Sequence, residues 1–148
     1  MKNNYNYIGI ILLLCSLQAN AAHSLLRANT EVDNAIHAII NKDCSISRRL
    51  YNSTDADDII FIVTVTCGNT TEFTQYLVNV YEENNIVKFI SPIIVGDSVD
   101  YSVESISIDN NIVLLNGYHW AETNNVCCPP YLEIKKYILN NHQIKEQK

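Results

Sequence analysis

The sequence predicts an α+β domain in which one N-terminal helix packs on an antiparallel meander sheet of about six strands. A single apolar stripe with helical spacing lies ahead of Cys44. After Cys44 the chain consists of strand-like apolar runs separated by short connections that contain Asn, Gly or Pro. Because strands joined by short connections pair in antiparallel fashion, we expect a meander with the helix on one face.

The first 21 residues have the features of a secretory signal peptide. A lysine near the start precedes an apolar run that begins at Ile8, and Ala19-Asn20-Ala21 matches the A-x-A cleavage signature. The apolar run is shorter than the roughly 20 residues of a membrane-spanning helix. We therefore expect cleavage near Ala21 and a soluble periplasmic or secreted domain over residues 22–148, without a transmembrane segment. An uncleaved N-terminal anchor is the alternative.

The helix is predicted over residues 31–41. Thr30 is placed to cap its N-terminus, with Asp33 at the third helical position as a short form of the capping box. Four apolar residues recur at helical spacing and predict one buried stripe: Val32, Ile36, Ile39 and Ile40. His37 follows Asp33 by four residues, a spacing that we interpret as an exposed side-chain pair.

Six segments are predicted as strands: residues 58–67, 73–82, 86–95, 101–109, 112–120 and 131–139. The first is nearly continuous in β-branched residues, which predicts a central strand covered on much of both faces. Asn84-Asn85 and Asn110-Asn111 are predicted as hairpin turns, because Asn tolerates positive φ. Asn140-Asn141 and the charged tail are expected to end the domain.

Two irregularities are expected within these strands. Pro92 lies inside the third segment and indicates an edge position or a bulge, since it cannot donate a backbone hydrogen bond. Gly96-Asp97 is expected to turn the chain after that segment. In the next strand the apolar alternation changes phase, which predicts a β-bulge near Glu104.

The length and charge of the chain exclude some classes of function. The length suits one domain with one core. The net charge is −6, and loss of Lys2 with the signal makes the remaining chain more acidic. This charge argues against nucleic acid as a partner and is compatible with a basic one. No metal-ligand spacing, phosphate loop or assembled acid–base pair is present, so we predict no catalytic residue, metal or cofactor.

Four cysteines remain after the signal, and in an oxidising compartment they are expected to form disulfides: Cys44, Cys67, Cys127 and Cys128. One arrangement joins Cys127 to Cys128 and Cys44 to Cys67; the latter bond closes a loop of about 23 residues and contributes roughly 3 kcal/mol. The other arrangement is crossed, because adjacent residues on an extended strand point to opposite faces. The sequence leaves both open.

The Cys127-Cys128-Pro129-Pro130 turn is the most distinctive stretch of the chain, since two prolines restrict φ beside the cysteines. A redox dithiol is an alternative, but it normally uses Cys-x-x-Cys at a helix start. A metal site with His119 is another, but zinc ligands are normally spaced as Cys-x2-4-Cys. Cys127 and His119 also resemble a nucleophile–base pair, for which the sequence shows no orienting group.

Two groups of residues are candidates for binding. Asp55, Asp57 and Asp58 supply carboxylates that can hold a cation weakly, but the spacing of a calcium loop is absent and a solvated loop is favoured. The second group places an imidazole, an indole and a carboxylate near a strand end, close to the two prolines: His119, Trp120, Glu122, Pro129 and Pro130.

The chain is rich in tyrosine, with nine in all. Six fall in predicted strands: Tyr76, Tyr81, Tyr101, Tyr118, Tyr131 and Tyr137. Cross-strand packing explains them most simply. An aromatic binding face is the alternative interpretation, because Tyr and Trp are favoured at interfaces.

Short motifs follow one another in a defined order through most of the chain: Asp55-Ala56-Asp57-Asp58, Tyr76-Leu77-Val78-Asn79-Val80-Tyr81, Val95-Gly96-Asp97, Val103-Glu104-Ser105-Ile106, His119, Cys127-Cys128-Pro129 and Tyr137-Ile138-Leu139. In this order they resemble an uncharacterised family of bacterial exported domains. The Asp-rich loop lacks the glycines typical of that family, and Pro130 replaces a small polar residue. The resemblance implies a fold and no activity.

These observations predict a non-enzymatic exported domain, periplasmic in a two-membrane bacterium, that binds another protein of the cell envelope or has a structural role there. An inhibitor or immunity protein fits this format by analogy. A small-ligand or cation-binding domain that uses the Asp55–Asp58 loop and the Cys127–Pro130 turn is the first alternative. A thiol-dependent enzyme is the second.

Overall fold

The computed structural model describes residues 25–54, 58–120 and 130–147. In these residues one helix, over 25–37, is followed by nine strands. The strands are β1 (Cys44–Ser53), β2 (Ile59–Cys67), β3 (Phe73–Glu83), β4 (Ile86–Phe89), β5 (Ile93–Asp97), β6 (Tyr101–Asp109), β7 (Ile112–His119), β8 (Tyr131–Asn140) and β9 (Gln143–Glu146). The predicted combination of one helix with antiparallel strands is confirmed. The single sheet of about six strands is wrong, because the strands form two sheets.

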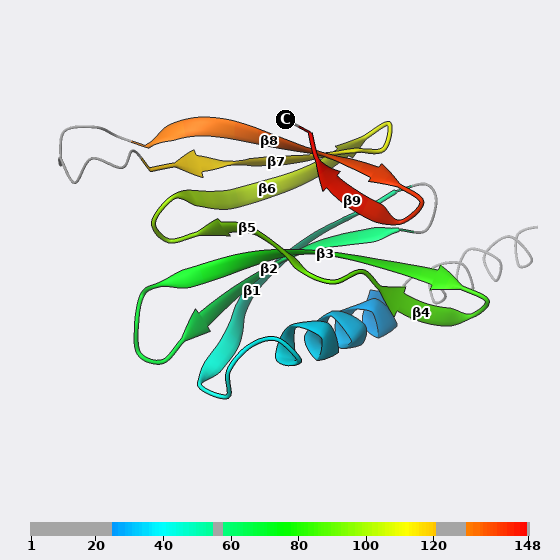
Figure 1. The fold of residues 1–148 in the computed structure, drawn as a ribbon, viewed down its shortest axis with the longest axis horizontal. Helices are drawn as coiled ribbons and strands as arrows, with labels where there is room; N and C mark the ends of the chain where they lie inside the picture. The colour runs from blue at the N-terminus through cyan, green and yellow to red at the C-terminus, as the bar shows by residue number, and fades with distance from the viewer. Residues whose placement is uncertain (1–24, 55–57, 121–129, 148) are drawn as a thin grey trace, which may run out of the picture.

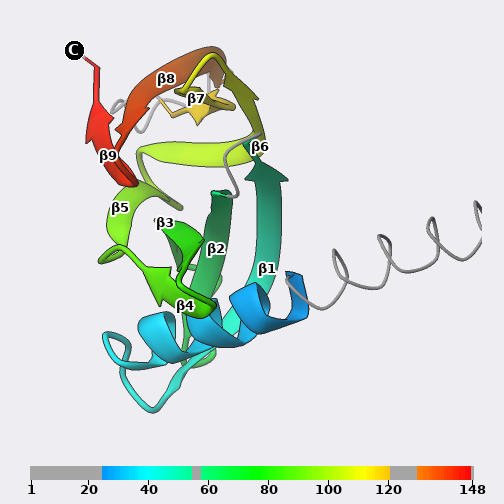
Figure 2. The same ribbon diagram turned by 90° about the vertical axis from the view of Figure 1, so that its right-hand side faces the viewer.

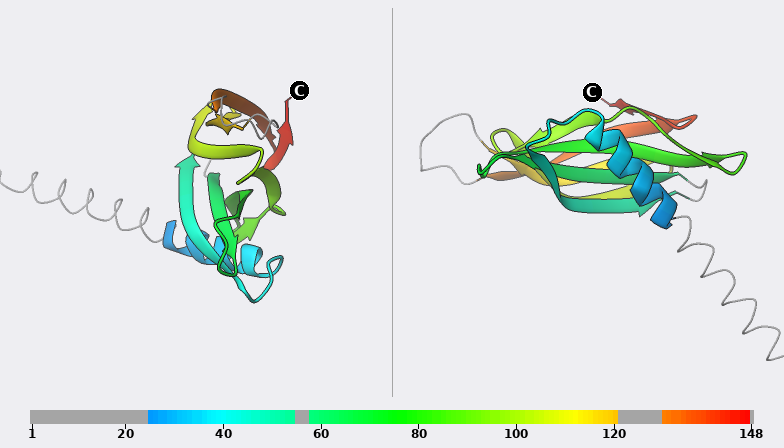
Figure 3. Two further views of the ribbon diagram at one scale, coloured as in Figure 1. Left: turned by 90° about the vertical axis from the view of Figure 1, so that its left-hand side faces the viewer. Right: turned by 90° about the horizontal axis from the view of Figure 1, so that it is seen from below.

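The helix and the two sheets form three layers, with the first sheet in the middle (Figure 1). The first sheet has the order β1-β2-β3-β4, and β5 also pairs with β3, next to β4. The second sheet has the order β6-β7-β8-β9. All these pairs are antiparallel, and the predicted meander order holds for β1–β4 and for β6–β9, whereas β5 returns to pair with β3. Figure 3 shows the helix lying obliquely across the strands of the first sheet.

Strand β2 is buried on both faces, as its β-branched sequence predicts. Ile60 and Ile62 face the second sheet and belong to a core that also includes Leu77, Val95, Tyr101, Val103, Val113, Leu115, Tyr137, Leu139 and Ile144. Phe61, Val63 and Val65 face the helix and pack with Ala28, Val32, Ile36, Val78 and Val80. Figure 2 shows the helix and the second sheet on opposite sides of the first sheet.

The described part of the helix covers 25–37, whereas the sequence predicted residues 31–41. Thr30 therefore lies inside the helix, where its hydroxyl donates to the carbonyl of Leu26 at 3.1 Å, and it does not cap it. The buried stripe extends toward the N-terminus to Ala28, while Ile39 lies beyond the helix and is exposed. Of the four predicted stripe residues, Val32 and Ile36 are buried on the helix, whereas Ile39 and Ile40 lie beyond its end, so the predicted bounds are too late in the sequence.

Asparagine turns define three hairpins. Asn84, Asn85, Asn110 and Asn111 have φ values of 55°, 61°, 47° and 64°, which confirms both predicted Asn-Asn turns. Asn141 and His142 form a third turn of the same kind, with φ values of 47° and 64°. This turn leads into β9, so the expectation that the domain ends at Asn140-Asn141 is wrong.

The remaining strand predictions are partly confirmed. The bulge in β6 lies at Glu104, because the pairing with β7 shifts between Val103 and Ser105. Pro92 separates β4 from β5, so the predicted strand over residues 86–95 is two strands. Gly96-Asp97 ends β5 rather than forming the turn itself; a carboxylate oxygen of Asp97 accepts the backbone N–H groups of Val99 and Asp100 at 2.8 and 2.7 Å. Strand β1 was not predicted.

A buried glutamine joins the two sheets. The side-chain oxygen of Gln75 on β3 accepts the backbone N–H of Val103 on β6 at 2.6 Å. Its side-chain nitrogen donates to the carbonyl of Val103 at 3.0 Å and to the hydroxyl of Thr64 at 3.3 Å. Gln75 thus completes the backbone hydrogen bonding of β6 beside the bulge, at the edge of β6 that does not pair with β7.

Candidate functional site

The structure shows how the two described cysteines are paired. Cys44 and Cys67 form a disulfide, and they are register partners at the ends of β1 and β2. The crossed arrangement, in which each would bond to Cys127 or Cys128, is therefore wrong. Cys127, Cys128, Pro129 and Glu122 lie outside the described residues, so the bond between Cys127 and Cys128 stays a prediction.

His119 lies at one end of the second sheet, between two carboxylates. Its Nε2 is 3.5 Å from Asp100 Oδ1, and its Nδ1 is 3.1 Å from Glu133 Oε2. His119 Nδ1 and Glu133 Oε2 are both buried and make no hydrogen bond within the described residues. His119 also pairs in register with Tyr131, and the two rings are 5.0 Å apart. Sequence reasoning did not find Asp100 and Glu133, because they are distant from His119 along the chain.

Trp120 and Pro130 lie beside this cluster in the sequence. The backbone N–H of Trp120 donates to the carbonyl of Asp100 at 2.7 Å, which joins the end of β7 to the start of β6, and the indole is exposed. Pro130 immediately precedes β8 and is half-buried. His119, Trp120 and Pro130 therefore do lie near one end of the second sheet. The described residues at that end supply no cysteine thiol for the proposed nucleophile–base pair.

Asp58, which immediately precedes β2, belongs to a buried polar network beside the β8–β9 turn. This turn is at the end of the second sheet opposite to His119. Asp58 is 4% exposed, and its Oδ1 accepts the side-chain nitrogen of Asn79 at 2.6 Å and lies 2.9 Å from His142 Nδ1. Asn79 also donates to the carbonyl of His142 at 2.8 Å, and the ring of Tyr81 stacks on the imidazole at 3.9 Å. This network anchors the β8–β9 turn to the first sheet.

The two predicted binding groups do not come together. Asp58 contacts the turn that follows β8, whereas His119 pairs with Tyr131 at the start of β8. A strand of ten residues is about 33 Å long, so one small ligand cannot contact both. Asp55 and Asp57 lie outside the described residues. The Asp58 carboxylate is already bonded within the protein, which does not favour a cation site built on it.

The feature that sequence reasoning missed is the face of the second sheet that points away from the first sheet, here called the outer face. Alternation along β7 and β8 places six apolar side chains on it: Ile112, Leu114, Tyr118, Leu132, Ile134 and Ile138. Register pairs Tyr118 with Leu132 and Ile112 with Ile138, and each of the two pairs between them combines one apolar with one polar residue, so apolar side chains form a strip across two strands that also includes Asn116 and Lys136. In the described part of the chain no helix or strand covers this strip (Figure 1).

The exposure of this strip is unusual for an antiparallel sheet. Leu132, Ile134, Tyr118 and Ile138 are 65%, 49%, 44% and 43% exposed. The alternate residues of the same strands fill the core, among them Val113, Leu115, Tyr137 and Leu139. An antiparallel sheet with one solvated face normally carries polar residues there. The flanking strands follow this rule: β6 has Ser102, Ser105, Ser107 and Asp109 at its paired outer positions, and β9 has Gln143 and Lys145.

The tyrosines divide between the two interpretations. Tyr101 and Tyr137 are buried in the core between the sheets, as cross-strand packing requires. The Tyr101 hydroxyl donates to the carbonyl of Leu115 at 2.7 Å. Tyr118 and Tyr131 are exposed, but alternation puts them on opposite faces of the second sheet. The outer face is therefore mainly aliphatic rather than aromatic.

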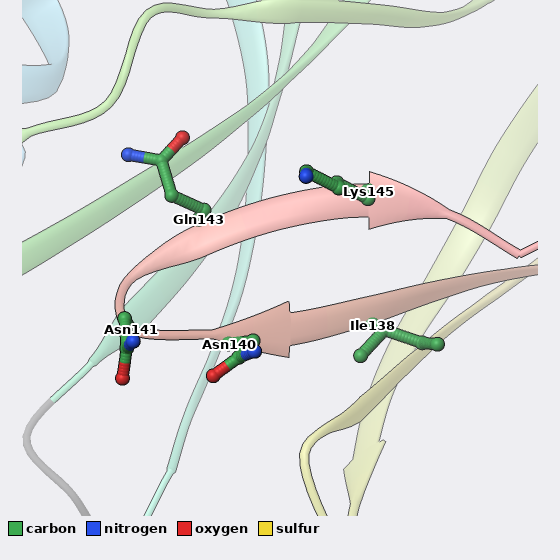
Figure 4. Close-up of a pocket in the computed structure, with 5 residues that line it drawn as sticks. All are labelled: Ile138, Asn140, Asn141, Gln143 and Lys145. Atoms are coloured by element: carbon green, nitrogen blue, oxygen red, sulfur yellow. The ribbon is translucent and has the colours of Figure 1, made fainter.

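A shallow hollow with a volume of about 270 Å³ continues the outer face at the β8–β9 hairpin. Its lining comes from both strands and from the turn: Ile138, Asn140, Asn141, Gln143 and Lys145 (Figure 4). Ile138 belongs both to the apolar strip and to the hollow. The outer face therefore offers an aliphatic surface that ends in a depression lined by Ile138 and four residues with polar ends.

Other kinds of site find no support in the described residues. Among residues 25–54, 58–120 and 130–147, no group of three or more His, Cys, Asp or Glu side chains is arranged to hold a metal ion. In the same residues, no helix has the length and apolar character needed to cross a membrane. No family model, no curated protein and no solved structure matches the chain. The resemblance to exported bacterial domains therefore stays an expectation from the sequence motifs.

Proposed function

We propose that this chain is an exported, non-enzymatic domain that binds another protein of the cell envelope through the outer face of its second sheet. The observation that carries the proposal is the strip of exposed aliphatic side chains on β7 and β8. Isolated apolar residues are normal on protein surfaces, but a contiguous apolar patch marks an interaction site. The signal-like first 21 residues support export.

Burial of this strip would supply part of the energy of an interface. Complete burial of a Leu or Ile side chain contributes about 1.5–3 kcal/mol, and Leu132, Ile134 and Ile138 still expose about half of theirs. Covering them together with Tyr118 therefore contributes on the order of 4 kcal/mol before the cost of association. That amount suits a central patch of a larger interface rather than a complete one.

The strip lies on a rigid support. Strands β7 and β8 are held from behind by core residues such as Leu115 and Tyr137, and β6 is fixed to the first sheet by Gln75. A surface on paired strands loses little conformational freedom when a partner binds, so more of the burial energy appears as affinity. The described residues of the two alternative functions, cation binding and thiol chemistry, are already engaged within the protein. Asp58 is bonded to Asn79 and lies 2.9 Å from His142, and the described cysteines form a disulfide.

Affinity capture with matched variants tests this proposal. The mature wild-type domain, the Leu132→Thr/Ile134→Thr double variant and an Ile94→Thr variant are immobilised and exposed to an envelope extract of the producing cell. Threonine keeps the β-branched character that strands favour. Ile94 is 64% exposed on β5 of the first sheet, so it controls for the loss of any exposed isoleucine. We expect wild type and Ile94→Thr to retain a protein that the double variant loses; equal retention by all three contradicts the proposal.

A further inference from the structure

We infer that the segment of the partner protein that docks on the β8–β9 end of the outer face carries carboxylate side chains. This inference rests on the proposed function and adds the chemistry of the partner. The outward positions of β8 and β9 carry two lysines, Lys136 and Lys145, and no acidic residue. The chain as a whole has the opposite sign, with a net charge of −6.

The two lysines lie on either side of the same aliphatic residue. Lys145 on β9 pairs in register with Ile138 on β8, and Lys136 is the preceding outward residue on β8. Diagonal neighbours on one face of an antiparallel pair are about 7–8 Å apart at the backbone. Two ammonium groups therefore flank the apolar side chain of Ile138, which is 43% exposed.

Neither lysine is neutralised within the described part of the protein. The other cations on described strands and on the helix have partners: Arg27 pairs with Glu82, Arg48 with Glu104, Arg49 with Asp33 and Lys88 with Glu83. Lys135 points to the other face, where its ammonium lies 4.1 Å from the centre of the Tyr101 ring. No such contact involves Lys136 or Lys145 in residues 25–54, 58–120 and 130–147, so both charges are available to a partner.

The hollow beside Ile138 has the donor groups that a carboxylate requires. Its polar lining consists of the Lys145 ammonium and the side-chain amides of Asn140, Asn141 and Gln143 (Figure 4). Each amide provides both N–H donors and a C=O acceptor, the ammonium provides donors only, and no carboxylate lines the hollow, so Lys145 sets the preference for an anion. A hydrogen bond from a charged or amide N–H to a carboxylate is stronger than one to a neutral acceptor. An Asp or Glu side chain of the partner fits this lining better than a Lys or Arg side chain.

The local charges outweigh the net charge of the chain at this position. Exposed charges more than about 8 Å apart are largely screened at physiological ionic strength. A carboxylate seated at Ile138 lies beside Lys136 and Lys145. Asp109, the acidic residue at a paired outer position of β6, is two strands away across Ile112, about 9.5 Å at the backbone. The adjacent aliphatic strip requires apolar contact as well, which favours an acidic segment of a protein over a nucleic acid backbone.

Peptide titrations followed by ¹H–¹⁵N NMR test this inference on the mature, oxidised domain. The probes are three synthetic peptides with the same apolar residues: acetyl-Glu-Leu-Glu-Ile-Glu amide and its counterparts with Gln or Lys in place of Glu. We expect the Glu peptide to shift the backbone amides of Ile138, Asn140 and Lys145 and to bind more tightly than the Gln and Lys peptides. Each exposed charge pair changes affinity by roughly 1.4- to fivefold.

A double substitution, Lys136→Gln/Lys145→Gln, gives the matched control for charge. It should lower affinity for the Glu peptide by roughly two- to 25-fold and remove the preference over the Gln peptide. Lys88→Gln, on β4 of the first sheet, should change neither. Equal binding of the three peptides, tighter binding of the Lys peptide, absence of binding at these amides, or an unaffected double variant would each overturn the inference. Loss of captured protein from Leu132→Thr/Ile134→Thr alongside any of these results would leave the proposed function standing.

Discussion

At the scale of single residues, a few side chains decide how the two sheets meet. Gln75 carries both hydrogen bonds to the Val103 backbone, and Gly117 allows β6 and β7 to approach around Tyr101. Neither role was predicted. No sequence pattern indicates which group the side-chain amide of Gln75 bonds to, because Val103 lies 28 residues away. Residues that act through local backbone conformation, such as Asn84 and Asn110, were predicted because their effect depends on neighbours in the sequence.

Replacing Gln75 with leucine should destabilise the domain by about 2–6 kcal/mol. The substitution leaves the N–H and C=O of Val103 buried without partners, and each unsatisfied group costs about 1–3 kcal/mol. Urea unfolding of the mature domain measures the change. Thr64→Val removes only the hydroxyl contact of Gln75 and should cost less than about 1.5 kcal/mol. Similar unfolding midpoints for the two variants would show that the Val103 contacts do not matter.

Gly117→Ala should destabilise the domain by about 3 kcal/mol or more, because the new methyl group has no space. A Cβ at this position would lie 2.1 Å from the Ser102 carbonyl oxygen and 2.8 Å from Cζ of Tyr101. Gly68→Ala is the comparison: no atom lies within 4 Å, but φ is +64°, so the cost is about 1–2 kcal/mol of backbone strain. Thermal or urea unfolding should place Gly117→Ala well below Gly68→Ala, and the reverse order would contradict this packing.

At the scale of elements, strands with strong alternation or paired Asn turns were predicted, and strands without them were not. Strand β6 has the predicted bounds and the predicted bulge. Strand β1 was missed because Ser-Arg-Arg in its middle gives no apolar alternation. It forms because it pairs with β2 along its whole length and is joined to it by the Cys44–Cys67 disulfide. Strand β9 was missed because the turn before it is formed by Asn141 and His142 rather than by an Asn-Asn pair.

The disulfide should stabilise the β1–β2 pair measurably. The double variant Cys44→Ser/Cys67→Ser should lose roughly 3 kcal/mol, because the bond closes a loop with a sequence separation of 23. Unfolding in urea under oxidising conditions gives the value. A second variant, Cys127→Ser/Cys128→Ser, should keep the Cys44–Cys67 bond, as peptide mass mapping can show. Free thiols at Cys44 and Cys67 in that variant would mean that the cysteines pair otherwise.

At the scale of the whole molecule, the three layers formed by the described residues leave one sheet face without cover. The sequence predicted a helix on a sheet, and the helix covers the first sheet only. The outer face of the second sheet could not be found from sequence, because an apolar residue in a strand is ordinarily assigned to the interior. Leu132 and Ile138 alternate along β8 with residues whose side chains lie in the core. The sequence pattern alone does not show which of these two sets faces the first sheet and which faces away from it. Of the predicted site residues, His119 and Asp58 lie at opposite ends of β8.

Two buried tyrosines in the core between the sheets should make the free energy of unfolding fall at alkaline pH. Burial raises the pKa of Tyr101 and of Tyr137 to about 12, and the Glu133 and Glu146 carboxylates add to this. The ordinary value is about 10, so the unfolded chain releases these protons first. Stability is therefore fully present below pH 10 and is lost as the pH rises toward 12. Urea midpoints at pH 8, 10 and 11 should fall less in Tyr137→Phe than in wild type; parallel curves would contradict burial of this phenol.

Site-specific photo-crosslinking in the producing cell tests the protein-binding role of the outer face most directly. A photoreactive phenylalanine is placed at Leu132 in one strain and at Ile94, an equally exposed position on the first sheet, in another. Illumination should join position 132 to a distinct envelope protein, and position 94 should give no such product. Absence of any adduct at position 132, or the same adducts from both positions, would contradict the assignment of the outer face as the binding surface.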